Sequence, residues 1–135
     1  PCYNSERFIR RTYESLKNQA FKNFEWLVID DCSSDRTLDI LNQLKQESEI
    51  KINVVKNNSN KMLAYNCNLA VTLAKGKFFI FLGHDDELVP LALKRFYEVW
   101  ENIPSSEKNN LVGMMSNCQD EQGFLFMMSY QSIQL

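Results

Sequence analysis

Two pairs of adjacent aspartates are the strongest chemical feature of this sequence. Asp30 and Asp31 end one apolar run, and Asp85 and Asp86 come shortly after another. Magnesium and manganese ions prefer carboxylate oxygens and other hard ligands. Clustered carboxylates also repel phosphates unless a cation lies between them. The residue types therefore suggest a site for a divalent cation and a phosphate-bearing ligand.

The apolar runs next to these aspartates are predicted to be buried strands. Neither run alternates polar and apolar residues, so both faces of each strand must be covered, as in a parallel sheet flanked by helices. The predicted strands are 25–31, 52–55 and 78–82. Apolar residues at helical spacing predict helices within 5–20, 33–44, 62–74 and 90–100. Asn4 or Ser5 is expected to cap the first helix, and Ser33 and Ser34 are expected to cap the second.

This alternation of elements predicts an α/β fold with a mostly parallel sheet and right-handed connections. Open α/β sheets bind ligands at the carboxyl ends of their strands. We therefore expect the two aspartate pairs to meet on one rim of the sheet. Past the fourth helix, strands are predicted at 111–116 and 124–128, with a turn at 117–123 that contains Asp120.

Length and composition indicate a single domain over residues 1–135. The chain is 44% hydrophobic and has a net charge of −2 with no basic stripe, which argues against a disordered chain and against a nucleic-acid binder. No apolar stretch is long enough to span a membrane. The four cysteines show no Cys-x-x-Cys spacing and are expected to be free thiols in a reducing cytoplasm. Both ends look cut, so we expect the chain to be part of a longer protein.

Four motifs in order resemble the nucleotide-sugar-binding part of family 2 inverting glycosyltransferases, which have the GT-A fold. The family carries Pro-x-Tyr-Asn, then Val-Asp-Asp-Gly-Ser-x-Asp-x-Thr, then Ala-Arg-Asn followed by Ala-x-Gly, then a strand end that contains Asp-x-Asp. The matching stretches are Pro-Cys-Tyr-Asn at 1–4, Trp-Leu-Val-Ile-Asp-Asp-Cys-Ser-Ser-Asp-Arg-Thr at 26–37, Asn66 with Ala-Lys-Gly at 74–76, and Phe-Ile-Phe-Leu-Gly-His-Asp-Asp at 79–86. One such motif is weak support, but four in the family's order are strong.

The resemblance implies how a donor would be bound. Asp85 and Asp86 would hold Mn²⁺ or Mg²⁺ and the sugar-ribose side of the donor. Asp31 would accept a hydrogen bond from the imide N–H of a uracil-type base, and Tyr3 would lie against the base ring. Asp30 would support this arrangement.

Three further residues near the expected site are less distinctive. Asn66 either orients the donor or holds two loops together. Lys61 could approach phosphate, but a lone lysine in an asparagine-rich loop is more simply a solvated side chain. His84 is more simply a polar surface group than a metal ligand.

The sequence departs from the family pattern at several points. Gly83 stands where many members carry the first aspartate of the acidic motif, and Cys32 replaces the usual glycine of the second motif. The strand that precedes the first motif is absent. The family's catalytic base is an aspartate or glutamate well downstream, and we expect it beyond Leu135.

The implied function is inverting transfer of a sugar from a nucleotide-diphosphate sugar, of the UDP type, to an acceptor hydroxyl. The resemblance suggests cell-surface polysaccharide synthesis on a glycan or lipid-linked acceptor, in the cytoplasm or at the inner membrane face. A homodimer is also expected. The alternatives are a non-catalytic nucleotide-sugar-binding fragment and a phospho-acceptor receiver domain; the latter also gathers acids at a sheet edge, but it needs a strand-end lysine that we do not find.

Overall fold

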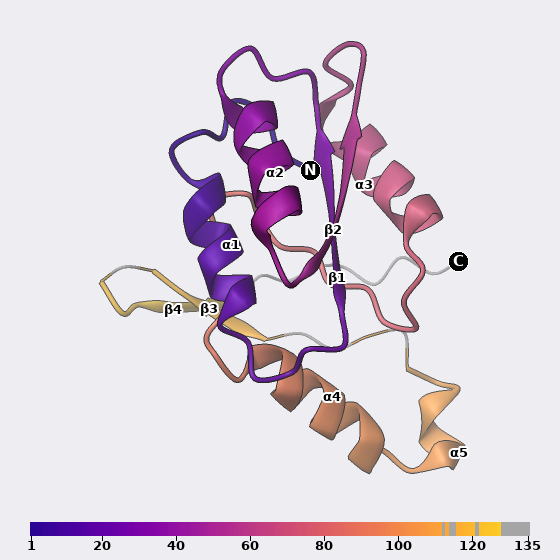
Figure 1. Cartoon of the computed structure of the whole chain (residues 1–135). Coiled ribbons are helices and arrows are strands. Elements are labelled where there is room, and N and C mark those ends of the chain that lie inside the picture. Colours follow the sequence, from indigo (N-terminus) through magenta and orange to yellow (C-terminus); the bar gives the residue numbers. More distant parts are fainter. Residues whose placement is uncertain (112, 114–115, 121, 128–135) are drawn as a thin grey trace. The chain divides into compact units, whose positions relative to one another are not determined.

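The computed structural model describes residues 1–111, 113, 116–120 and 122–127 (Figure 1). The chain forms two compact units, Pro1–Lys94 and Arg95–Leu135, which are described separately. The single domain expected over 1–135 stays a prediction. Among the described residues, no helix has both the length and the apolar character needed to cross a membrane.

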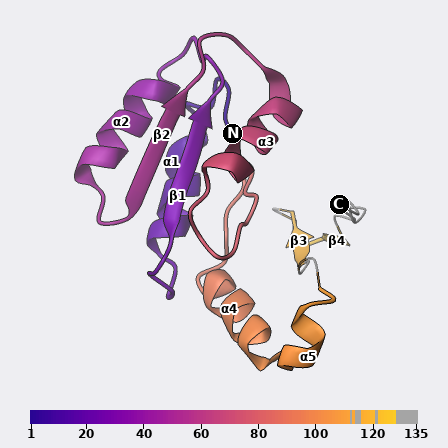
Figure 2. The ribbon, with the colours of Figure 1, turned by 90° about the vertical axis from the view of Figure 1, so that its right-hand side faces the viewer.

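The first unit is built around a parallel pair of strands, β1 (Glu25–Asp30) and β2 (Lys51–Lys56). Their register pairs Glu25 with Lys51 and Asp30 with Lys56, so the two strands end at the same level. Helices α1 (Ile9–Lys17) and α2 (Thr37–Glu47) lie on one face of this sheet, and α3 (Met62–Leu73) lies on the other (Figures 1 and 2). The predicted α/β layering is confirmed for this part of the chain.

The core of this unit lies between the sheet and the first two helices. Apolar side chains on α1 and α2 recur at helical spacing, and those of the strands face them. The buried cluster is Cys2, Ile9, Tyr13, Val28, Ile40, Leu41, Leu44 and Ile52. Burial, and then the nearby charge of Asp30, raises the pKa of the Cys2 thiol to about 12, so Cys2 is a neutral packing residue. All four cysteines are free, as predicted.

The predicted caps of the first two helices are wrong. Residues 5–8 make an extra turn before α1, in which the N–H groups of Phe8 and Ile9 both donate to the Ser5 carbonyl oxygen. Asn4 therefore lies one turn too early to cap α1, and its side-chain oxygen instead accepts from the Ser34 N–H at 2.9 Å. At the start of α2, Asp35 accepts from the Thr37 N–H at 3.0 Å and performs the role expected of the serines.

The predicted strand at 78–82 is also wrong, because these residues form no strand. Their apolar side chains are not buried: Phe78 to Phe81 are 39–50% exposed. The backbone N–H and C=O groups of successive residues in a strand point to alternate edges, so each edge of a strand needs its own pairing partner. At the edge of β1 opposite β2, the described pairing is one bridge, between Cys2 and Asp30. Residues 78–82 have no ladder partner there, and an apolar composition alone does not make a strand.

The second unit contains most of α4 (Ala92–Asn102), the short helix α5 (Ser105–Lys108), and an antiparallel pair, β3 (Asn117–Gln119) and β4 (Leu125–Met127). The predicted strand at 111–116 is not found at the described positions 111, 113 and 116, and its other positions lie outside the described residues. The turn is shorter than predicted, because β3 occupies 117–119. Asp120 is a turn residue as expected, since its carboxylate accepts from the N–H groups of Gln122 and Phe124. The returning strand is confirmed at 125–127, and position 128 lies outside the described residues.

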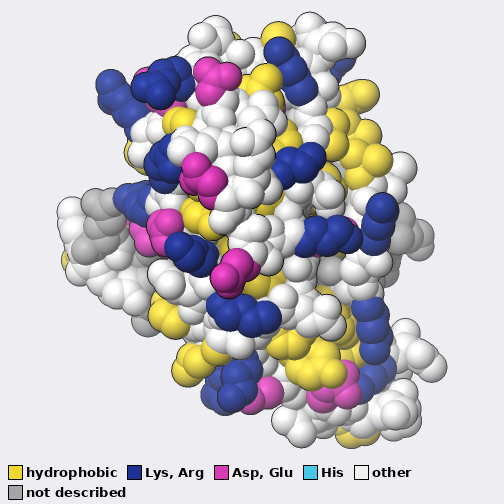
Figure 3. All heavy atoms as spheres, in the orientation of Figure 1, with side chains coloured by type: hydrophobic (Ala, Val, Ile, Leu, Met, Phe, Trp, Pro, Cys, Tyr) yellow, Lys and Arg dark blue, Asp and Glu magenta, His cyan; other side chains and the backbone are white. Residues whose placement is uncertain are grey.

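Charged side chains of both signs are intermingled on the face shown in Figure 3. In this view α1 and α2 lie to the left of the sheet and α3 lies to its right.

Candidate functional site

Asp31 lies directly after β1 and joins three segments of the chain. Its side chain is only 4% exposed. One carboxylate oxygen accepts from the Lys61 N–H at 2.8 Å and from the Asn57 side-chain amide at 2.7 Å, and the other accepts from the Met62 N–H at 2.9 Å. The end of β1 is thereby tied to the end of β2 and to the first turn of α3.

The charge of Asp31 is stabilised by these donors. Burial acts to raise the pKa of its carboxyl group, but the hydrogen bonds from Asn57 and from the N–H groups of Lys61 and Met62 outweigh burial. The pKa of Asp31 therefore lies below its ordinary value of 3.8, and the group is a carboxylate at neutral pH.

Asn57 is the residue that sequence reasoning missed at this position. Its side-chain amide donates to Asp31 and also to the Asn66 side-chain oxygen, both at 2.7 Å. Asn66 is 1% exposed, and its own amide donates to the Met62 carbonyl oxygen at 2.9 Å. Asn66 thus holds two loops together in this structure. Asn57 could have been found by applying the strand-end rule to β2, because it directly follows Lys56.

Asp30 is completely buried behind this cluster. One of its oxygens accepts from the Ser33 N–H at 3.3 Å. The other has no hydrogen-bond partner among the described residues, which is unusual for a buried carboxylate. Asp30 therefore keeps one acceptor atom that the described part of the chain does not use.

Tyr3 and Lys61 both lie near Asp31 and both remain exposed. The Asp31 N–H donates to the carbonyl oxygen of Cys2, the residue before Tyr3, and the Lys61 N–H donates to the Asp31 carboxylate. The Tyr3 side chain is 46% exposed, which leaves part of its ring accessible. Lys61 places its ammonium group 6.0 Å from the centre of the Tyr65 ring, as a cation above an aromatic face.

Asp85 and Asp86 lie in an irregular loop between 78–82 and α4, and both are exposed. Their carboxylates converge beside Gly83. A Cβ atom at Gly83 would lie 2.5 Å from one oxygen of Asp86 and 3.1 Å from one oxygen of Asp85. Glycine at this position therefore makes room for the two carboxylates to approach the same point.

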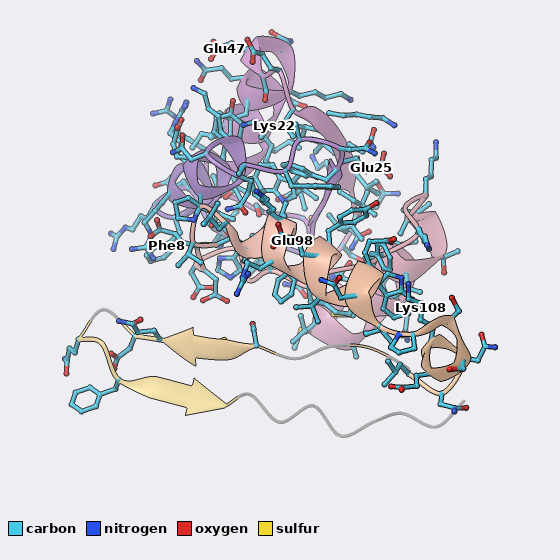
Figure 4. All side chains as sticks on the ribbon, turned by 90° about the horizontal axis from the view of Figure 1, so that it is seen from below. Phe8, Lys22, Glu25, Glu47, Glu98 and Lys108 are labelled. Carbon is cyan, nitrogen blue, oxygen red and sulfur yellow. The ribbon has the colours of Figure 1, made fainter. Side chains whose placement is uncertain are left out.

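This acidic loop is held by polar side chains of α1 that sequence reasoning also missed. The Thr12 hydroxyl lies 2.9 Å from the His84 carbonyl oxygen and 3.0 Å from that of Asp86. Figure 4 shows the described side chains from below. Two of its labelled residues flank α1 in the sequence: Phe8 directly precedes the helix, and Lys22 follows it by five residues. The available signal was a set of polar residues at helical spacing, namely Thr12, Ser15 and Gln19.

The two aspartate pairs were expected to share one rim, and this stays a prediction. Within the described ranges, no three His, Cys, Asp or Glu side chains are grouped so that they could hold a metal ion. A cation bound here would therefore need ligands besides Asp85 and Asp86. His84 differs from its predicted surface role, because its Nδ1 atom is buried and lacks a hydrogen-bond partner within the described chain.

Two curated proteins similar to this chain are glycosyltransferases by name. A glycosyltransferase described as uncharacterized, from Haemophilus influenzae, is 30% identical over 105 residues, which are 78% of this chain and 34% of that protein. The UDP-Glc:alpha-D-GlcNAc-diphosphoundecaprenol beta-1,3-glucosyltransferase WfaP of Escherichia coli is 40% identical over 85 residues, which are 63% of this chain and 33% of WfaP. The chain spans about a third of the length of these relatives.

A solved structure supports the same relationship. The crystal structure of Staphylococcus aureus TarS 1–349 in complex with UDP superposes with a TM-score of 0.70 at 33% identity, covering 75% of this chain and 30% of that one. The likeness to TarS identifies the fold as GT-A. The family model for glycosyl transferase family 2 matches residues 1–106. Taken with the two aspartate-bearing loops, this match means that the chain belongs to glycosyl transferase family 2.

Proposed function

We propose that this chain is the donor-binding part of an inverting glycosyltransferase. It would bind a nucleotide-diphosphate sugar of the UDP type, from which the sugar passes to an acceptor hydroxyl. The single observation that carries the proposal is the convergence of the Asp85 and Asp86 carboxylates beside Gly83. The crystal structure of TarS 1–349 in complex with UDP-GlcNAc supports the choice of donor class. Its TM-score to this chain is 0.70.

The cation in this proposal is Mn²⁺ or Mg²⁺, held by Asp85 and Asp86. Two converging carboxylate oxygens suit a hard divalent ion, which is commonly held by one or two carboxylates with phosphate oxygens completing its shell. When bound, such an ion would supply charge neutralisation to the departing diphosphate. The two aspartates contribute the fixed negative charge that would keep the ion next to the donor.

The base and ribose of the donor would lie near the Asp31 cluster. Asp31 stays ionised and could accept from an imide N–H, although its oxygens already accept three hydrogen bonds. The exposed ring of Tyr3 is suited to stacking on a base. Asp30 would support this arrangement from the interior, where one of its oxygens has no hydrogen-bond partner among the described residues, and Asn66 would keep the loop after β2 in place.

Transfer with inversion also requires a base that deprotonates the acceptor hydroxyl. We assign this role to no described residue and expect it outside residues 1–135, as the family resemblance implies. The acceptor would be a glycan or lipid-linked sugar in cell-surface polysaccharide synthesis, in the cytoplasm or at the inner membrane face. The relatives named for a diphosphoundecaprenol-linked sugar and for poly(ribitol-phosphate) support this setting. A homodimer is part of the proposal.

The test is calorimetric titration of the chain with UDP, with and without Mn²⁺. We expect Mn²⁺ to strengthen UDP binding. Asp85→Ala/Asp86→Ala should lower the UDP affinity measured with Mn²⁺ at least about tenfold, since the loss of charged ligands typically costs more than 1.4 kcal/mol. Asp31→Ala should weaken binding with and without the ion. Asp39→Ala removes an exposed carboxylate from α2 and should change neither value.

Gly83→Ala provides a finer variant in the same titration. Its methyl group would displace the Asp86 carboxylate while leaving both aspartates in place, so the Mn²⁺-dependent gain should fall although the net charge is unchanged. A UDP affinity that changes neither with Mn²⁺ nor with the Asp85→Ala/Asp86→Ala substitution would contradict the metal assignment. Tighter binding of GDP or dTDP would correct the nucleotide, and binding without turnover in the longer protein would favour a non-catalytic role.

A further inference from the structure

One side of α1, continued by Gln19 just past the end of the helix, carries buried polar side chains where apolar ones would be expected. Thr12, Ser15 and Gln19 recur at intervals of three and four residues and are 1%, 8% and 0% exposed. Buried polar groups are costly unless they are hydrogen-bonded. We call these residues, together with the neighbouring Arg11, the α1 clasp.

The front of the α1 clasp holds three consecutive carbonyl groups of the acidic loop. The Thr12 hydroxyl lies within hydrogen-bond distance of the His84 and Asp86 carbonyl oxygens, and an Arg11 guanidinium nitrogen donates to the Asp85 carbonyl oxygen at 2.7 Å. Arg11 also forms an ion pair with Glu87 at 3.0 Å. The loop backbone is thus held on both sides of Asp85.

The rear of the α1 clasp holds the residues that follow. The Ser15 hydroxyl accepts from the Leu88 N–H at 3.2 Å. The Gln19 amide donates to the carbonyl oxygens of Leu88 and Val89 at 3.3 and 2.9 Å, and its oxygen accepts from the Leu93 N–H at 3.1 Å. The segment from 84 to 93 therefore follows α1 over most of the helix length.

This arrangement separates the anchoring groups of the loop from its free groups. The loop is irregular, so its backbone groups have no ladder or helix to satisfy them. Side chains of the clasp form hydrogen bonds with several of these backbone groups. The Asp85 and Asp86 side chains remain exposed. The other side of α1 is fixed in the core through Ile9 and Tyr13, which gives the loop a rigid support.

We propose that Thr12 is a positioning residue that sets where the Asp85 and Asp86 carboxylates lie, and that it thereby tunes the affinity for a divalent cation with a nucleoside diphosphate. This inference rests on the proposed function. Residues that orient metal-binding side chains through a second layer of hydrogen bonds typically change metal affinity about 10- to 100-fold when altered.

The test compares Thr12→Val, which removes the hydroxyl at nearly constant shape, with Thr12→Ser, which keeps it. Thr72→Val is the matched control, because Thr72 also donates its hydroxyl to a carbonyl oxygen, that of Asn68, but on the exposed side of α3. Two readouts are needed: amide hydrogen exchange of 84–93 in the free chain, and calorimetric UDP affinity with and without Mn²⁺.

Thr12→Val should speed exchange at 84–93 while leaving β1 and β2 unchanged. It should lower the Mn²⁺-dependent part of UDP affinity about tenfold and leave affinity without the ion unaltered. Thr12→Ser should restore both readouts, and Thr72→Val should affect neither. A purely structural role would instead change binding equally with and without Mn²⁺.

The two proposals can fail separately. If the unaltered chain binds no UDP, the proposed function is wrong, and normal exchange at 84–93 in Thr12→Val would overturn the clasp as well. If the unaltered chain shows Mn²⁺-dependent binding and Thr12→Val retains it in full, the positioning role is wrong while the donor site stands.

Discussion

At the scale of single residues, Cys32 has a backbone conformation that its side chain disfavours. Its φ is +63°, in the left-handed region. A residue with a Cβ atom is less stable there by about 1–2 kcal/mol, whereas glycine adopts this region freely. The family pattern has glycine at this position, and the backbone of this chain has kept the conformation that suits it.

Cys32→Gly should therefore stabilise the chain, by about 1 kcal/mol once the greater chain entropy of glycine is subtracted. Chemical denaturation followed by circular dichroism would measure the change. The matched control is Cys67→Gly within α3, where the same substitution should destabilise by roughly 0.3 kcal/mol because glycine is a poorer helix former than cysteine. Destabilisation by both variants would show that the strain at Cys32 is relieved elsewhere.

At the scale of elements, the joint between β1 and α3 depends on an ionised group. The Asp31 carboxylate accepts from the two backbone N–H groups at the start of α3, so protonation removes an anion from a helix N-terminus. Its pKa in the folded chain lies below the ordinary value of 3.8, which an unfolded chain would show. A depressed pKa means that the contribution to stability is present at neutral pH and is lost as the pH falls through the folded value.

We expect the melting temperature to fall on acidification below pH 3.8, with part of the drop due to Asp31. Asp31→Asn should lower the melting temperature at pH 7 and flatten its dependence on pH in the acid range. Glu49→Gln, at an exposed position just after α2, should leave the slope unchanged. An acid slope that is identical in Asp31→Asn and the unaltered chain would contradict this account.

The elements also show what sequence patterns can and cannot predict. Apolar patterns predicted β1, β2, α1 and α2, whose apolar side chains supply the buried core. They also predicted α3, although Asn66 and Ala70 are its buried residues and most of its large apolar side chains are exposed. The strand prediction failed at 78–82, where the apolar run forms no strand and its side chains are not buried. Periodicity also gave no warning of the α1 clasp, because polar residues on a helix are ordinarily solvated and only their burial reveals partners far along the chain.

At the scale of the whole molecule, four consecutive large apolar side chains, from Phe78 to Phe81, are 39–50% exposed. Exposed apolar runs of this kind are typical of surfaces that associate. If a second copy of the chain covers this run, Ile80→Lys should raise the dimer dissociation constant at least about tenfold, measured by sedimentation equilibrium. Val71→Lys, at an exposed position of α3, should not. A chain that is monomeric at all concentrations would remove the homodimer from the proposal.

The candidate site was predicted in its residue types but not in its supports. Strand ends and motif order pointed to Asp31 and to Asp85 with Asp86, because carboxylates at such positions have few structural reasons to be there. Asn57 could have been singled out as a strand-end residue, but its pairing with Asp31 could not be predicted, because Asn57 looks like any other residue of a polar loop. Only the fold brings its amide within 2.7 Å of both Asp31 and Asn66.

The α1 clasp has a consequence for the order in which this chain folds. Its partners lie between 69 and 76 residues further along the sequence. During synthesis, α1 leaves the ribosome long before those partners exist, and closing so long a loop carries an entropic cost that local contacts do not repay. The acidic loop should therefore order last, after β1, β2 and α3 are in place. Its protection from exchange during refolding would then mark the moment at which the first unit is complete.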